Sequence, residues 1–292
     1  MTPTSPVSAI ITACNRREKT LQTLKRIYEC RPQPSEVLVH VDGGNRALAT
    51  ELGACFPSAR ILVSQEHLGP GGGRNLLISE SCHELVASFD DDSYPLDGDF
   101  FSRVVRVSED APQAAILAAT VIEPSSRTTR EGPLIRSASF VGCGCIYRRR
   151  VFLSTAGYVP LPLAYGMEEL DLAMRLHAMN QMIVHSPDLR VYHDTDLRHR
   201  FASPINAAVT TNAALLVYLR YPIILWPLGM VQMVGTIIDL IMQKRFGGVC
   251  SGIMNIPSEC ARQRAHRKPL TAASILSYLA LRRRCDRENV AP

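Results

Sequence analysis

The chain has 292 residues, of which 46% are hydrophobic and 20% are charged. This is the composition of a globular protein large enough for one sizeable α/β domain and an appendage. The nine cysteines are odd in number and form no CxxC pair, which argues against a zinc ribbon or a disulfide framework and favours reduced thiols in the cytoplasm. The formal net charge is +5, and arginines are concentrated over residues 262–287. Such a basic stretch favours an anionic partner surface.

Apolar runs alternate with helical patterns over the first hundred residues. Strands are predicted over residues 7–14, 36–42, 59–65 and 85–89, and helices over residues 15–30, 46–56 and 74–84. Strands that alternate with helices pair in parallel through right-handed crossovers. The fold class is therefore predicted to be α/β, with a doubly wound, Rossmann-like and mostly parallel sheet.

Polar side chains follow three of these four strands. Asn15 and Arg16 come after the first strand, Asp42 after the second, and the acidic run that contains Asp90 and Asp92 after the fourth. In doubly wound sheets, ligands bind where the carboxyl ends of the strands meet. Carboxylates at alternate positions can point to the same side of an extended segment and hold a hard divalent cation. A solvated acidic turn is the alternative explanation.

A glycine-rich segment, "GPGGGRN" at residues 69–75, follows the third strand. It matches neither the ATP-binding P-loop nor the dinucleotide fingerprint. We expect a loop whose glycines let the backbone approach a ligand, with Arg74 at the start of the next helix offering a planar charged fork to a diphosphate. A flexible turn with a surface arginine is the alternative.

The middle of the chain is less regular. Strands are predicted over residues 114–122, 138–149 and 181–194, a polar loop over residues 123–133, and a helix over residues 166–180. The first turn of that helix carries Glu168, Glu169 and Asp171, and a carboxylate held near an acceptor hydroxyl can act as its general base. Complementation of the positive helix N-terminus explains one or two of these acids equally well. His193 at the end of the last strand is a candidate metal ligand, although a lone histidine is more often structural.

The composition changes near residue 206, and we predict a domain over residues 1–205 and a helical extension over residues 206–292. Residues 213–245 are largely apolar and flanked by basic side chains, but Pro222 and Pro227 would break a single helix. The preferred interpretation is a helical segment that lies on a membrane surface. A spanning helix and a buried helical hairpin are the alternatives.

The order of these motifs resembles the inverting nucleotide-sugar glycosyltransferases of family 2, which have the GT-A fold. The resemblance lies within residues 7–200, in the stretches "ITACNRRE", "VLVHVDGG", "HLGPGGGRN", "ASFDDDSYP", "MEELDLAMRL" and "VYH". Each motif is weak alone, but the ordered set is specific. Two positions depart from the family pattern, because Val41 stands where a second acid often precedes Asp42 and because Glu169 stands where aspartate is usual.

The resemblance implies a role for each matched residue. The residues implied to form the nucleotide site are Thr12, Cys14, Asp42, Arg74, Asp90 and Asp91. Within this set Asp42 would contact the nucleobase, Asp90 the ribose, and Asp91 would support its neighbours. Asp92 and His193 would bind the metal, expected to be Mn2+ or Mg2+.

The resemblance also implies the groups that act on the acceptor. Glu169 falls at the position of the catalytic base, and Glu168 beside it is the alternative. Gly142 and Cys143 would form part of the acceptor-side wall. The implied reaction is one displacement at the anomeric carbon, in which the base deprotonates the attacking hydroxyl.

The resemblance thus implies a metal-dependent inverting hexosyl- or deoxyhexosyltransferase that moves a sugar from a nucleoside-diphosphate sugar to a hydroxyl acceptor. We expect it to serve lipid-linked, envelope or other glycan biosynthesis at the cytoplasmic face of a membrane, without a nucleic-acid partner. One alternative is a nucleotidyltransferase that makes a nucleotide sugar, which "TACNRRE" disfavours because it lacks glycine after the first strand. The other is a non-catalytic, membrane-peripheral binding protein, which would not need the acidic cluster.

Overall fold

The computed structural model describes residues 3–124, 132–195 and 201–290, and these form two compact units. The first unit comprises Met1–Pro162 and Gln181–Thr195, and the second comprises Leu163–Asn180 and Asp196–Pro292. The helix predicted over residues 166–180 thus groups with the C-terminal helices. The division after residue 205 rests on composition and stays a prediction.

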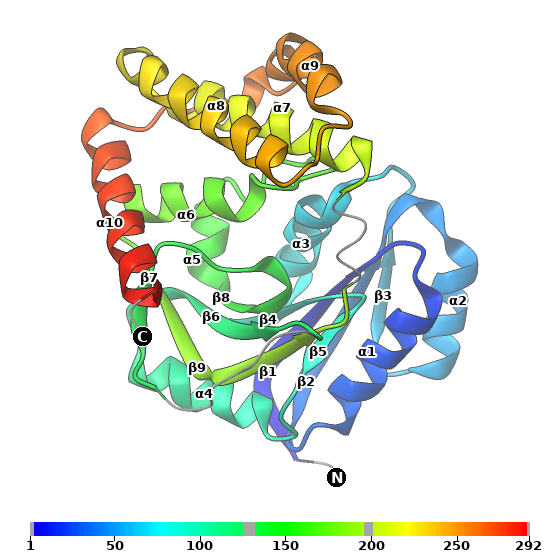
Figure 1. The fold of residues 1–292 in the computed structure, drawn as a ribbon. Helices are drawn as coiled ribbons and strands as arrows, with labels where there is room; N and C mark the ends of the chain where they lie inside the picture. Colours follow the sequence, from blue (N-terminus) through cyan, green and yellow to red (C-terminus); the bar gives the residue numbers. More distant parts are fainter. Residues whose placement is uncertain (1–2, 125–131, 196–200, 291–292) are drawn as a thin grey trace. The chain divides into compact units, whose positions relative to one another are not determined.

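The first unit is built on one mixed sheet of nine strands among its described residues (Figure 1). The strands are β1 (Thr4–Ala13), β2 (Gln33–Val41), β3 (Arg60–Val63), β4 (Leu85–Asp90), β5 (Ser93–Pro95), β6 (Ala114–Ile122), β7 (Ile135–Ser137), β8 (Cys145–Arg148) and β9 (Met182–His193). Their order is β3-β2-β1-β4-β8-β6-β9-β5, and β7 pairs with β9. The strands β3, β2, β1 and β4 are parallel, as predicted, whereas β8 runs antiparallel to both of its neighbours.

Helices cover this sheet, with a 3-10 turn after β2 and another before β8. They are α1 (Arg17–Glu29), α2 (Arg46–Cys55), α3 (Gly69–Glu80), α4 (Phe100–Asp110) and α5 (Arg149–Ser154), with η1 (Asp42–Gly44) and η2 (Gly142–Gly144) as the turns. Val7 and Ile11 of β1 share a buried cluster with Leu24 of α1 and Val104 of α4. Because successive side chains of a strand point to opposite faces, these helices cover one face of β1.

The glycine-rich segment is not a loop, and that prediction was wrong. Its glycines lie in the first turns of α3, which begins at Gly69. The reason is close packing: a Cβ on Gly69 would lie 2.0 Å from the carbonyl oxygen of Leu161, and a Cβ on Gly73 would lie 2.6 Å from Nδ1 of His40. Gly69 also adopts a φ of +71°, which favours glycine. These glycines therefore bring the chain close to itself.

Two further elements differ from the predictions. Helix α4 was not among the predicted elements, although its buried Phe101, Val104 and Ser108 recur at helical spacing. The strand predicted over residues 138–149 is shorter, because η2 precedes β8 and α5 begins at Arg149. The loop predicted over residues 123–133 lies mostly outside the described residues.

The second unit is helical throughout its described part. It contains α6 (Glu168–Ala178), α7 (Ser203–Arg220), α8 (Trp226–Met242), α9 (Val249–Arg262) and α10 (Ala272–Val290), with the short turns η4 (Ile223–Leu225) and η5 (Arg264–His266). The apolar stretch predicted over residues 213–245 is divided near Pro222 between α7 and α8, as its prolines suggested. Within the described chain, Ile223–Met242 is the one segment whose length and composition would suit a membrane-crossing helix.

Candidate active site

The carboxyl ends of β1 and β4 bring the first candidate residues together. The register pairs Thr12 with Asp90, and the hydroxyl of Thr12 donates to Oδ1 of Asp90 over 3.0 Å. Arg74 also forms an ion pair with Asp90, and its Nε donates to Oγ of Ser88 over 3.1 Å. Arg74 is only 2% exposed and lies in the second turn of α3 rather than at a helix start. Its guanidinium therefore holds Asp90 in position, and a contact with the diphosphate stays a prediction.

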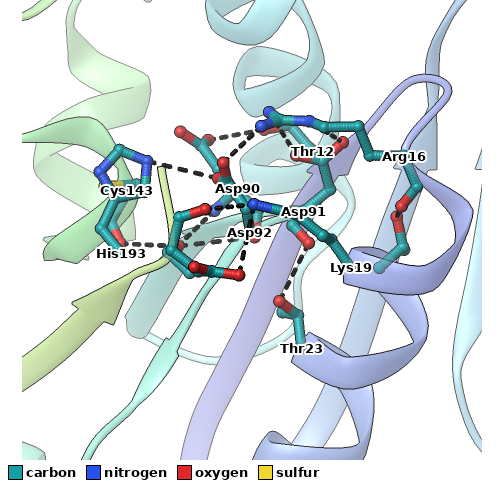
Figure 2. Close-up of polar contacts among 12 residues, drawn as sticks. Thr12, Arg16, Lys19, Thr23, Asp90, Asp91, Asp92, Cys143 and His193 are labelled. Atoms are coloured by element: carbon teal, nitrogen blue, oxygen red, sulfur yellow. Dashed lines mark hydrogen bonds and ion pairs between the residues drawn. The ribbon is translucent and has the colours of Figure 1, made fainter. Parts of the chain in front are cut away.

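Asp91 and Asp92 share one guanidinium, that of Arg16 (Figure 2). The Nη2 of Arg16 lies 2.6 Å from Oδ1 of Asp91, and its Nη1 pairs with Oδ2 of Asp92. Lys19 adds a second cation beside these acids through its ion pair with Asp194. The three aspartates at residues 90–92, here called the acidic edge, thus receive their positive partners from the chain itself.

Burial and neighbouring charges shift the pKa values of Asp91 and Asp92 in opposite directions. Burial raises the pKa of Asp91 to about 7, because Arg16 offsets only part of the effect of burial and of the neighbouring carboxylates. Burial also acts to raise the pKa of Asp92, but the hydrogen bond from His193 and the charges of Arg16 and Lys19 outweigh it, so that pKa is lowered. Asp92 is therefore the member held more firmly as a carboxylate.

His193 reaches the acidic edge because β9 pairs with β5. The register sets Ser93 opposite His193, and Nε2 of His193 lies 3.3 Å from Oδ1 of Asp92. Burial acts to lower the pKa of His193, but the hydrogen bond to Asp92 and the charges of Asp92 and Asp90 outweigh it, so the pKa is raised. The predicted proximity of Asp92 and His193 is thus present in the fold.

One group of side chains among the described residues has donor atoms placed to share a metal ion. It consists of Asp90, Cys143 and His193, whose ligand atoms lie within 4.8 Å of one another (Figure 2). Ser93 ties this group together, since its Oγ accepts from the backbone N–H of Asp90 over 2.8 Å and donates to the carbonyl oxygen of Cys143 over 3.1 Å. A carboxylate, a thiol and an imidazole fit a transition metal better than Mg2+, which prefers oxygen ligands.

This group differs from the predicted metal pair in two members. His193 belongs to both, whereas Asp90 and Cys143 were not predicted as metal ligands and Asp92 is not a member of the group. In the structure Asp92 contacts Arg16 and His193 instead. Cys143, predicted at the acceptor wall with Gly142, is buried in η2 beside the acidic edge.

The carboxylate of Asp42 is already hydrogen-bonded to the backbone at the start of α3. Its Oδ1 accepts from the backbone N–H of Leu68 over 2.8 Å, and its Oδ2 accepts from that of Gly69 over 2.9 Å. His67 lies 2.7 Å from the same carboxylate through Nδ1. Asp42 therefore caps the start of α3, and its contact with a nucleobase stays a prediction. Cys14 is half-buried nearby, and burial together with the charge of Asp42 raises the pKa of its thiol.

The second unit carries the predicted base. Glu168 and Glu169 lie in the first turn of α6, where Glu168 is buried and Glu169 is half-buried. Asp171 is 1% exposed and pairs with Arg175 and Arg220. These two buried ion pairs account for the third acid of the helix, so the choice of base stays between the two glutamates.

Sequence reasoning missed two contributors to the first unit's site. It noted Arg16 after the first strand without assigning it to the aspartates, although a cation next to an acidic strand end is a usable signal. Ser93 was not identified either, and its hydroxyl links β5 to Cys143 of η2, 50 residues further along the chain. No local pattern reveals that link.

The nine-stranded mixed sheet with acids at its parallel strand ends has the architecture of a GT-A glycosyltransferase. The sequence matches Glycosyl transferase family 2 over residues 8–155, so the chain belongs to this family. No curated protein sequence matches it.

Solved structures support the same fold. A mannosyltransferase from Pyrobaculum calidifontis in complex with GDP-Man and Mn2+ has 13% identity and a TM-score of 0.58, covering 99% of this chain and 89% of its own. GalNAc-T7 with UDP, GalNAc and Mn2+ has 14% identity and a TM-score of 0.58 over 75% of this chain, which spans 48% of that protein. TarS from S. aureus in complex with UDP-GlcNAc has 13% identity and a TM-score of 0.55, covering 73% and 70% of the two chains.

Proposed function

We propose that the protein transfers a sugar from a nucleoside-diphosphate sugar to an acceptor hydroxyl with inversion at the anomeric carbon. The observation that carries this proposal is the cluster of Asp90, Cys143 and His193 at the carboxyl edge of the parallel strands, within the fold of its family. The solved relatives named with GDP-Man or UDP together with Mn2+ support a nucleotide-sugar donor and a divalent metal. Family membership favours sugar transfer over the synthesis of a nucleotide sugar.

The metal site is assigned to the three residues of this cluster. A bound divalent ion would neutralise negative charge on the diphosphate of the donor. Asp92 orients His193 through the 3.3 Å contact, and Arg16 holds Asp92 in place. The alternative, in which Asp92 itself is a ligand, remains the sequence prediction, and the two are separated by metal titration of Asp90→Asn and Asp92→Asn.

The proposed base is Glu169, which takes the proton of the attacking hydroxyl. Thr12 and Arg74 hold Asp90, which would contact the ribose of the donor, and Cys14 and Asp42 directly follow β1 and β2. One displacement needs no covalent nucleophile on the protein. Inversion follows because the hydroxyl attacks the face opposite the departing nucleotide.

The test begins with ligand binding. The melting temperature of the full chain is measured with UDP and with GDP, in the presence of Mn2+ or Mg2+, because a ligand that binds the native state stabilises it. We expect one nucleotide with Mn2+ to raise the melting temperature. Equal melting temperatures under all conditions would contradict the proposal.

The second step measures catalysis. Release of nucleoside diphosphate from UDP-sugars and GDP-Man is followed by chromatography, and the anomer of the transferred sugar is read by NMR. We expect Glu169→Gln to lower turnover about 100- to 10,000-fold, the usual contribution of a general base. If only Glu168→Gln does so in a protein with an unchanged melting temperature, the base is Glu168. A retained anomeric configuration would rule out the single displacement.

A further inference from the structure

The exposed side of α8 is apolar. Its exposed apolar side chains, here called the apolar face of α8, are Trp226, Met230, Val231, Val234, Ile238, Ile241 and Met242. Most of them recur at intervals of three or four residues, so they share one side of the helix. Val231 is 69% exposed and Met242 is 77% exposed. Surface helices of soluble proteins normally direct such a stripe toward the core, and contiguous exposed apolar patches mark interaction sites.

The opposite side of α8 packs against the protein. A Cβ on Gly229 would lie 2.4 Å from Cγ1 of Val217, so α8 and α7 approach closely there, and Leu240 is buried near the other end. The polar Gln232 also turns inward, where its Oε1 accepts from the hydroxyl of Tyr221 over 2.6 Å. The helix is thus held to the protein through one side, while its apolar face stays exposed.

Helix α7, on which α8 packs, buries several polar side chains. In α7, Asn206 is fully buried, and it donates to the carbonyl oxygen of Gly247 and accepts from Nε of Arg245. Thr210 and Thr211 are buried as well. Because α8 is packed along α7, a spanning α8 would draw this helix and its buried polar side chains into the depth of the bilayer as well. A position in the plane of the interface keeps them in the protein.

Basic groups lie at both ends of the apolar face. The guanidinium of Arg267 lies 5.6 Å from the ring centroid of Trp226, and Lys268 beside it is exposed. Lys244 is exposed just beyond the last turn. The only acidic residue of α8, Asp239, is exposed but lies outside the arc of the apolar face by helical spacing. Tryptophan and basic residues that border an apolar stripe match the headgroup level of an anionic bilayer.

We propose that the apolar face of α8 docks on an anionic lipid bilayer, with the helix lying in the plane of one leaflet. The charge at both ends of the face favours this occupant over a second copy of the chain, whose corresponding face would bring like charges together. The inference concerns the second unit alone and stands whether or not the proposed sugar transfer is correct.

Vesicle binding by the full chain tests the proposal. Co-sedimentation is measured with vesicles of phosphatidylcholine alone and with vesicles that also contain phosphatidylglycerol. Trp226 is the only tryptophan in the chain, so its emission reports directly on the end of the face. We expect binding to the anionic vesicles together with a blue shift of this emission.

Substitutions on α8 test whether its apolar face makes the contact with the vesicles. Val231→Glu with Val234→Glu is expected to weaken binding about tenfold or more, because two apolar side chains are lost from the interface and two negative charges are added. Leu96→Glu with Leu153→Glu is the matched control in the first unit, at similarly exposed apolar positions, and is expected to bind like the wild type. Lys244→Ala is expected to weaken binding to the anionic vesicles about fivefold.

Three outcomes would overturn the proposal. The first is the absence of vesicle binding, or binding that the α8 pair leaves unchanged while circular dichroism shows the variant folded. The second is a concentration-dependent dimer, by light scattering, that the α8 pair abolishes while vesicles have no effect, which would assign the face to a second copy. The third is protection of the chain beyond Lys244 from external trypsin in vesicles, which would show a spanning helix.

Discussion

The acidic edge of the first unit buries charged side chains, whereas the apolar face of α8 in the second unit exposes apolar ones. Both are the reverse of what is usual in a soluble protein. At the acidic edge, Asp91 and Asp92 are almost fully buried, and cations from the same chain approach all three carboxylates. On α8, large apolar side chains are between 37% and 77% exposed in the described chain. Charge that is buried with partners indicates a prepared site, whereas apolar surface left open indicates a partner outside the chain.

The largest expected effect is at the acidic edge. Asp90→Asn removes the carboxylate that Thr12 and Arg74 hold and that the candidate metal cluster shares. We expect nucleotide-sugar turnover to fall about 100- to 1,000-fold, the range for loss of one preorganised electrostatic group. Asp188→Asn, at an exposed ion pair with Arg106, is the control and should retain activity. Similar turnover for the two variants would remove Asp90 from the site.

Substitutions of the adjacent residues Arg16 and Arg17 test whether the buried carboxylates of the acidic edge depend on the guanidinium of Arg16. Arg16→Ala leaves Asp91 and Asp92 buried without the guanidinium that bridges them, and we expect a loss of about 1–3 kcal/mol in the free energy of unfolding. Arg17→Ala removes only an exposed pair with Glu51, which solvent screens, and should leave the free energy of unfolding nearly unchanged. Urea denaturation measures both. Equal losses would mean that the acidic edge does not depend on Arg16.

Metal preference tests the thiol of the candidate cluster. Cys143→Ser replaces a soft ligand with a hard one, so we expect the preference for Mn2+ over Mg2+ to fall about tenfold. Binding is measured by isothermal titration, and Co2+ adds a thiolate charge-transfer absorption band that the variant should lack. Cys55→Ser, at an exposed cysteine, is the control. An unchanged spectrum and unchanged affinities would exclude Cys143 as a ligand.

The smallest effect on stability is expected on the apolar face of α8. Val231→Gln changes an exposed position on α8, and the free energy of unfolding in solution should stay within about 0.5 kcal/mol of the wild type. Leu240→Gln, at a buried position of the same helix, should cost several-fold more because it buries an amide. Thermal unfolding without lipid distinguishes the two. A large loss for Val231→Gln would show that part of the chain covers the face.

The parallel part of the fold could be predicted because its information is local. Apolar runs of strand length alternate with helical spacing, and the polar residues at the strand ends identify one edge of the sheet. The glycine-rich segment could not be read in this way, because Gly69 and Gly73 are required by Leu161 and His40, which lie far away in the sequence. Asp42 likewise finds its hydrogen-bond donors at Leu68 and Gly69.

Sequence alone determined the class of the sheet, the order of the motifs and the residues Asp90, Asp92 and His193 as candidates. Only the tertiary structure decided how these side chains are partnered. Cys143 joins Asp90 because β8 inserts beside β4, and His193 joins them because β9 pairs with β5. The apolar character of α8 is likewise visible in the sequence, but which side stays open depends on its packing against α7. Strand order and helix packing are set by contacts between distant residues, and local patterns do not encode them.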